Sequence, residues 1–187
     1  MSRWKPDAAG RLAKAAITLF EERGYEATTV AEIAEAAGLT KRTFFRYFAD
    51  KREVLFGGSN DLQERWVATV SEAPPEAGAL EAIELGLDAV ATFFNEHHDF
   101  ARMRARIVAA NPELQERDLI KLARLADALA AALRARGVAD QAAELAAQTG
   151  VMVFHSAFAH WVQQDDPAAM RDLMGEALDD LRAVVAA

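Results

Sequence analysis

Cations, hydroxyl groups and aromatic rings gather in one short stretch near the start of the chain. Residues 40–52 carry five Lys or Arg side chains against a single Asp, although the whole chain of 187 residues has a net charge of −8. Residues 57–187 carry 11 basic against 21 acidic side chains. Because ammonium and guanidinium groups bind phosphates, we expect a polyanion to bind at residues 40–52 and not at the acidic remainder.

A helix that begins after Thr40 would sort these side chains onto two faces. At about 100° per residue, Arg42 and Arg46 lie one turn apart on the outer face, whereas Phe44 and Phe48 point into a core. Cationic, hydroxyl and aromatic side chains are the groups that contact phosphates and base edges in the major groove of DNA. The pattern therefore predicts a DNA-reading helix.

The elements that must position this helix directly precede it. Thr29 and Glu32 have the spacing of a capping box, which predicts the start of a short helix. Gly38 can adopt the left-handed conformation that side chains resist, and Thr40 can cap the helix that follows. Two short helices joined by residues 37–39 have the spacing of a helix-turn-helix.

Apolar residues recur at the helical three-and-four spacing along the rest of the chain, and no segment shows sustained strand alternation. We therefore predict an all-α fold, with a three-helix DNA-binding domain at residues 1–50 and a larger helical domain at residues 51–187. About nine helices are expected, at residues 7–23, 29–37, 40–48, 50–71, 76–96, 99–110, 112–136, 140–164 and 167–185.

Other classes of function are excluded or disfavoured by residue type. The chain has no Cys, which excludes disulfides, thiolate nucleophiles and Cys-ligated zinc. His97, His98 and Asp99 are the best candidates for a metal-dependent enzyme, but adjacent histidines on a helix diverge by about 100°. We expect no enzyme, no metal and no cofactor. A helical interaction module whose helix-turn-helix is only structural stays open as the alternative.

Residues 145–164 form the longest stretch in which a membrane span could be sought, because they carry no formal charge. Seven polar side chains in this stretch would be costly in hydrocarbon, so we expect a buried helix and no membrane partner. No secretory signal pattern follows Met1, and the expected location is the cytoplasm.

Residues 28–51 resemble the DNA-binding signature of TetR-type bacterial transcriptional repressors. The resemblance rests on the runs TTVAEIA at 28–34, AGLT at 37–40 and TFFRYFADK at 43–51, which match without insertion. It implies a regulator of double-stranded DNA, with repression as the family default. It further implies phosphate contacts from Thr29, Thr40, Tyr47 and Lys51, and base contacts from Lys41, Arg42, Thr43 and Phe45, with Arg46 at a variable position.

The last two helices carry more apolar surface than one small core needs. Residues 151–162 are apolar nearly all round, and an apolar stripe runs along residues 170–185. A helix buried on two faces is expected to contact both its own core and a partner subunit. We predict a homodimer through the last two helices, which would present two reading helices about one DNA turn apart to a palindromic site.

The family resemblance also implies an interior pocket for a small, largely apolar effector. Residues 104–108 and 111–117 are similar to a TetR subgroup that takes acyl-coenzyme-A-like ligands; Arg102, Arg104 and Arg106 could bind an anionic head group or form a solvated face. The candidate lining residues, each of which could instead be plain core, are Trp66, Phe93, Phe94, Phe100, Met103, Leu122, His155, Phe158 and Trp161.

Overall fold

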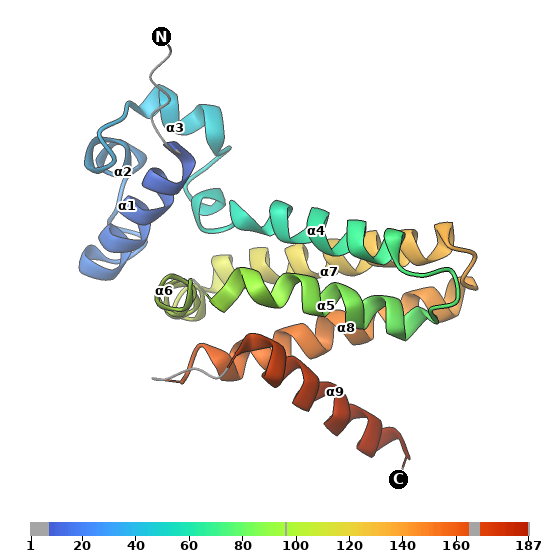
Figure 1. Ribbon diagram of the computed structural model, residues 1–187. Helices are drawn as coiled ribbons and strands as arrows, with labels where there is room; N and C mark the ends of the chain where they lie inside the picture. The colour runs from blue at the N-terminus through green and yellow to red at the C-terminus, as the bar shows by residue number, and fades with distance from the viewer. Residues whose placement is uncertain (1–7, 96, 165–168, 187) are drawn as a thin grey trace. The chain divides into compact units, whose positions relative to one another are not determined.

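The computed structural model describes residues 8–95, 97–164 and 169–186. In these ranges the chain forms nine α-helices and one short 3-10 helix, with no β-strand, which confirms the predicted all-α fold (Figure 1). The helices are α1 (Ala8–Arg23), α2 (Val30–Ala36), α3 (Lys41–Tyr47), η1 (Arg52–Leu55), α4 (Gly58–Glu72), α5 (Ala79–Asn95), α6 (His98–Ala109), α7 (Pro112–Ala135), α8 (Asp140–Trp161) and α9 (Met170–Ala186).

Contacts divide the chain into two compact units. The N-terminal unit comprises the described part of residues 1–60 together with residues 102–118, and the C-terminal unit comprises the described part of residues 61–101 and 119–187. The N-terminal unit therefore extends beyond residue 50 and includes the end of α6 and the start of α7. The sequence pattern did not predict that residues 102–118 belong to the N-terminal unit.

The N-terminal unit is built on the amphipathic helix α1, whose Leu12, Ala16 and Phe20 are buried. Gly24 and Gly38 end α1 and α2 at φ of 87° and 65°, a backbone region that favours glycine. The capping box at the start of α2 is confirmed. Glu32 accepts a hydrogen bond of 2.8 Å from the Thr29 amide, and the Thr29 hydroxyl accepts one of 3.3 Å from the Glu32 amide.

The expected single helix over residues 50–71 is wrong, because the chain breaks at Phe56 and Gly57. The Asp50 carboxylate accepts hydrogen bonds from the amides of Arg52 and Glu53, which starts the short turn η1 instead of a long helix. Phe56 is then buried, and Gly57 lies so close to the Phe48 ring that a Cβ there would be 3.1 Å away. Helix α4 begins only after this turn.

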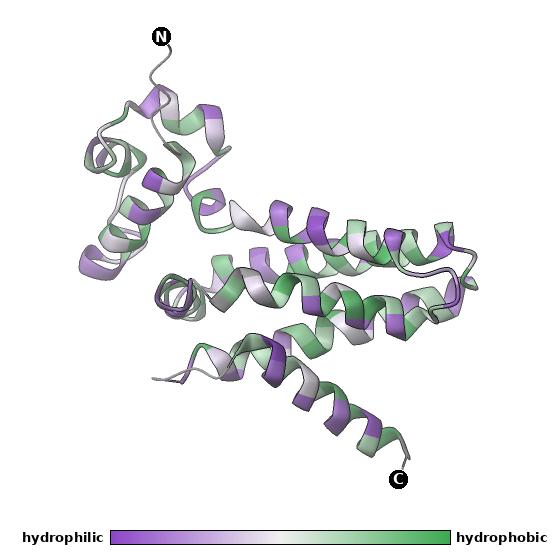
Figure 2. Ribbon diagram, in the orientation of Figure 1, coloured by the Kyte–Doolittle hydropathy of each residue, from purple (hydrophilic) through white to green (hydrophobic). Residues whose placement is uncertain are grey.

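The C-terminal unit is a helical bundle in which α8 packs against α5 and α9 (Figure 1). Hydrophobic and hydrophilic residues occupy different faces of these helices, and the hydrophobic faces form one continuous core (Figure 2). The guanidinium of Arg136 donates to the carbonyls of Ala73 and Pro74, at 2.6 and 2.7 Å, and so ties α7 to the loop after α4. None of the described helices is long and apolar enough to span a bilayer.

Candidate nucleic-acid interface

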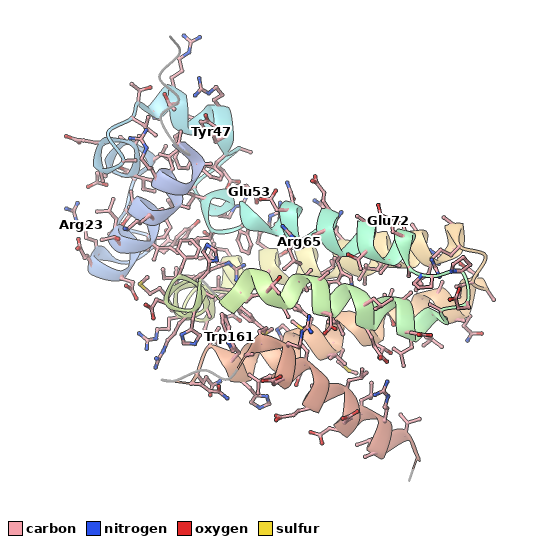
Figure 3. All side chains as sticks on the ribbon, viewed as in Figure 1. Arg23, Tyr47, Glu53, Arg65, Glu72 and Trp161 are labelled. Atoms are coloured by element: carbon pink, nitrogen blue, oxygen red, sulfur yellow. The ribbon has the colours of Figure 1, made fainter. Side chains whose placement is uncertain are left out.

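Helix α3 presents a face of exposed aromatic rings and cations. As predicted, Phe44 and Phe48 are buried, whereas Phe45 and Tyr47 are 48% and 45% exposed. Tyr47 is labelled on α3 in Figure 3. Large exposed rings are unusual on a solvated helix face and mark interaction surfaces. The predicted cations Lys41, Arg42 and Arg46 are exposed on the same short helix, so the predicted division into a buried and an exposed face is confirmed.

The exposed rings hold two of these cations in place. The Arg46 guanidinium lies 4.9 Å from the centroid of the Tyr47 ring and donates a hydrogen bond of 3.1 Å to its hydroxyl. The Lys41 ammonium lies 6.0 Å from the centroid of the Phe45 ring. Because cation–π contacts restrict the side chains, the surface is partly ordered before any nucleic acid binds.

The predicted threonines have local partners at the starts of α2 and α3. The Thr40 hydroxyl accepts a hydrogen bond from the Thr43 amide at 3.2 Å and pairs with the Thr43 hydroxyl at 3.0 Å. The Thr29 hydroxyl donates to the Glu32 carboxylate at 2.7 Å, and this bond lowers the pKa of Glu32. Thr29 therefore caps α2, and Thr40 caps α3, the helix that carries the exposed face.

Lys51 is already engaged within the protein. Its ammonium donates a hydrogen bond of 2.8 Å to the carbonyl of Tyr25 and lies 4.0 Å from the centroid of the Tyr25 ring. Burial raises the pKa of the Tyr25 hydroxyl, and the nearby Glu113 carboxylate raises it further. A phosphate contact from Lys51 would have to add to, or replace, this bond.

Ion pairs and hydrogen bonds that the sequence did not predict complete the N-terminal unit. Arg117 donates to the Glu53 carboxylate at 2.6 Å, which raises the pKa of Arg117. Arg104 donates to the Leu55 carbonyl at 2.8 Å and to the Asp118 carboxylate at 2.6 Å. Arg104 is thus used in packing. No local pattern could have revealed these bonds, because most of the partners lie about 50 to 60 residues apart.

Four of the expected pocket residues come together in the C-terminal unit. The rings of Phe94, Phe158 and Trp161 lie with centroids 5.6 to 6.1 Å apart, and Phe154 joins them to Trp66. Leu122 is partly buried against the same core. Phe154 was not among the expected pocket residues, although it shares a face of α8 with Phe158.

The remaining expected pocket residues are not shown to be part of this aromatic cluster. His155 is exposed, contrary to its expected place in an apolar interior, because it faces away from the core side of α8. Met103 belongs to the segment grouped with the N-terminal unit. Phe100 is partly buried on α6, and the side chain of Phe93 lies outside the described residues.

His98, at the start of α6, is also used in packing. The His98 ring meets Trp161 edge-on with centroids 4.6 Å apart, and its Nε2 lies 3.0 Å from the Trp161 carbonyl oxygen. The Asp99 side chain is 99% exposed. In the part of the chain that the structure describes, no three His, Asp or Glu side chains are grouped closely enough to hold a metal ion.

Matches to known families agree with this geometry. Residues 12–56 match the family model for bacterial regulatory proteins of the tetR family, and residues 77–186 match the model for the MftR C-terminal domain. The second match covers more than half of the chain. The chain belongs to the TetR family of transcriptional regulators. The TetR-family assignment makes helices α2 and α3 its DNA-binding helix-turn-helix.

Individual relatives support the TetR-family assignment. The chain is 29% identical over 167 residues to MftR of Mycobacterium tuberculosis, which is named as a mycofactocin biosynthesis transcriptional regulator. The alignment covers 88% of this chain and 84% of that protein. It shares its fold with FadR of Bacillus subtilis, solved in complex with stearoyl-CoA: the TM-score is 0.62 at 21% identity, covering 91% and 95% of the two chains. FadR of Thermus thermophilus, solved in complex with lauroyl-CoA, also has this fold, with a TM-score of 0.56 at 23% identity and 91% of each chain covered.

Proposed function

We propose that this TetR-family regulator represses transcription as a homodimer on a palindromic operator and is released by a small, largely apolar effector. The observation that carries the DNA-binding part is the exposed face of α3, where Arg46 and Lys41 lie against exposed rings. Such a face suits the major groove, because it combines phosphate-binding cations with groups that can contact base edges.

Individual side chains are assigned separate parts in this proposal. Lys41, Arg42, Thr43 and Phe45 contact bases, and Arg46 occupies a variable position of the reading helix. Thr29, Thr40, Tyr47 and Lys51 contact phosphates. The arginine side chains can bind guanine through two hydrogen bonds, and the Phe45 ring can contact the methyl group of thymine.

Exposed apolar side chains on the last two helices support the homodimer. Leu145 and Met152, seven residues apart on α8, are 58% and 51% exposed in the single chain. Val184 near the end of α9 is 76% exposed. A second copy that covers these side chains would remove them from water, and a twofold axis would place two α3 helices about one turn of DNA apart.

The effector is proposed to be an acyl-coenzyme-A-like compound whose chain enters the aromatic interior of the C-terminal unit. Two proteins of the same fold were solved with stearoyl-CoA and with lauroyl-CoA. In this chain the rings of Phe94, Phe154 and Phe158 offer the apolar environment that such a chain requires.

Selection of bound sequences from a random DNA pool tests the DNA-binding part. A palindrome with two half-sites about one helical turn apart is the expected product, and its affinity should fall steeply with salt. The double variant Arg42→Ala with Tyr47→Phe should lose this binding. Arg124→Ala removes one exposed cation from α7 and should not. If no sequence is enriched at low or moderate salt, the chain is a helical interaction module instead.

Measuring the oligomeric state tests the dimer separately. In sedimentation experiments, Met152→Asp should convert the dimer to monomers, because it places a charge in the proposed apolar interface. Leu119→Asp is the matched control, since Leu119 is 64% exposed on α7 and lies outside that interface. A wild-type protein that sediments as a monomer would exclude the homodimer.

A further inference from the structure

Trp66 is fully buried in the C-terminal unit, and two glycines on neighbouring helices make room for its indole. A Cβ atom at Gly86 of α5 would lie 2.0 Å from the Trp66 ring, a distance that real Cβ contacts do not show. A Cβ at Gly150 of α8 would lie 3.4 Å from the same ring and 2.4 Å from the Ile83 side chain. The indole therefore lies directly against the backbone of α5.

A hydrogen bond fixes the ring in this position. The indole N–H donates to the Ile83 carbonyl at 3.3 Å, which satisfies the one polar group that Trp66 buries. Rotation of the ring would break this bond and move the indole into helix backbone. Trp66 is thus held by steric contact and by a hydrogen bond together.

The two sides of Trp66 differ in composition. The ring cluster of Phe94, Phe154 and Phe158 lies further along α5 and α8 than Gly86 and Gly150, and Phe158 is partly buried. In the opposite direction along the same helices lie the fully buried small residues Ala82, Ala143 and Ala147. Phenylalanine rings lack hydrogen-bonding groups and can change rotamer, whereas close helix contacts through alanine leave no space.

We infer that Trp66 is the inner wall of the proposed effector chamber, the site that a ligand chain would take among the rings of Phe94, Phe154 and Phe158. Trp66 sets the longest apolar chain that this chamber accepts. This inference rests on the proposed apolar effector and names the residue that limits its length. A ligand chain enters among the phenylalanine rings, which move aside, and its end stops at the Trp66 indole.

Binding constants for straight-chain acyl-CoA thioesters from 8 to 20 carbons test this inference. In the wild type, each added methylene should improve Kd about fourfold until the chain end meets the indole, after which Kd should worsen. In Trp66→Ala the optimum should move to chains longer by about four methylenes, because the indole volume becomes available. Trp66→Phe, which truncates less of the wall and should fold more readily, should give a smaller shift in the same direction.

Val70→Ala is the matched control. Val70 is fully buried one turn after Trp66 on α4, so this variant removes core volume without opening the chamber, and the optimal chain length should not change. An unchanged optimum in both Trp66 variants overturns the inference.

A second measurement separates this inference from the effector proposal. If the wild type binds no acyl-CoA of any length, the proposed effector class is wrong, and free indole is then titrated into Trp66→Ala. A rigid wall leaves an indole-shaped cavity, so indole should raise the Tm of this variant and not that of the wild type. No rise means that the helices close over the site, and Trp66 is then not a fixed wall.

Discussion

Arg104 donates a hydrogen bond from its Nε to the backbone carbonyl of Leu55 at 2.8 Å, although the two residues are 49 positions apart in the chain. The same guanidinium donates to Asp118 and lies 4.7 Å from the centroid of the Phe56 ring. One arginine therefore joins η1 to the segments of α6 and α7 that complete the N-terminal unit. Its planar group suits three such contacts better than an ammonium would.

Replacing this arginine should weaken the N-terminal unit. Arg104→Lys keeps the charge but loses the forked geometry and leaves the Leu55 carbonyl poorly paired, so we expect a loss of about 1–3 kcal/mol in the free energy of unfolding. Urea unfolding measures it. Arg106→Lys, at an exposed position of the same helix, should change stability by less than about 0.5 kcal/mol. Equal losses in both variants would contradict the assigned role of Arg104.

Stability should depend on pH through Asp50. Its hydrogen bond from the Arg52 side chain, together with those from the amides of Glu53 and Arg52, lowers the pKa of its carboxyl group below the ordinary value. The unfolded chain binds the proton more tightly, so this contribution is present above the unfolded pKa of about 4 and is lost as the pH falls through the lowered folded pKa.

Comparing wild type with Asp50→Asn isolates that contribution. The stability difference between them should be constant from pH 7 to about pH 5 and should shrink in more acidic solution. The carboxylate is 40% exposed, so the difference should be small. Chemical unfolding at a series of pH values measures it, and a difference that grows on acidification would rule out the assigned cause.

Two glycines in helix interiors should respond in opposite ways to alanine. Gly86→Ala forces a methyl group into the Trp66 ring and should destabilise the protein by about 2 kcal/mol or more. Gly175→Ala on α9 meets nothing within 4 Å and should stabilise it by about 0.5–1 kcal/mol. Thermal unfolding of the two variants checks both signs, and a stable Gly86→Ala protein would remove the basis for a fixed Trp66.

Replacing Lys41 should affect operator binding alone, whereas replacing Lys51 should affect both operator binding and Tm. Lys41→Met should lower the salt dependence of operator binding by about one unit of log–log slope and leave Tm unchanged, since Lys41 is exposed on α3. Lys51→Met should also lower Tm, because the bond to the Tyr25 carbonyl is lost. Should Lys51→Met unfold like the wild type, its bond to Tyr25 contributes nothing measurable.

Local patterns predicted the local structure well. The capping box of Thr29 and Glu32, the glycine turn at Gly38 and the burial of Phe44 are all set by residues within about four positions of one another. The break after η1 was not predicted, because helical spacing continues through it and the interruption depends on the packing of Gly57 against Phe48.

Long-range pairing explains most of what the sequence could not provide. Lys51 looks like a free cation until Tyr25, 26 residues earlier, is seen to accept its hydrogen bond. The Arg117 bond to Glu53 spans 64 residues. His155 was placed in the interior because its helix is apolar on most sides, and the packing of α8 against α5 and α9 decided which side is exposed.

The segment of residues 102–118 within the N-terminal unit has a consequence for synthesis of the chain. A ribosome makes the helix-turn-helix first, but Leu55 and Glu53 have no hydrogen bond from Arg104 and Arg117 until those two arginines have been translated. The nascent DNA-binding helices therefore complete their packing only after α4, α5 and α6 have been translated. A growing chain gains its finished DNA-reading unit only when a large part of its regulatory domain already exists.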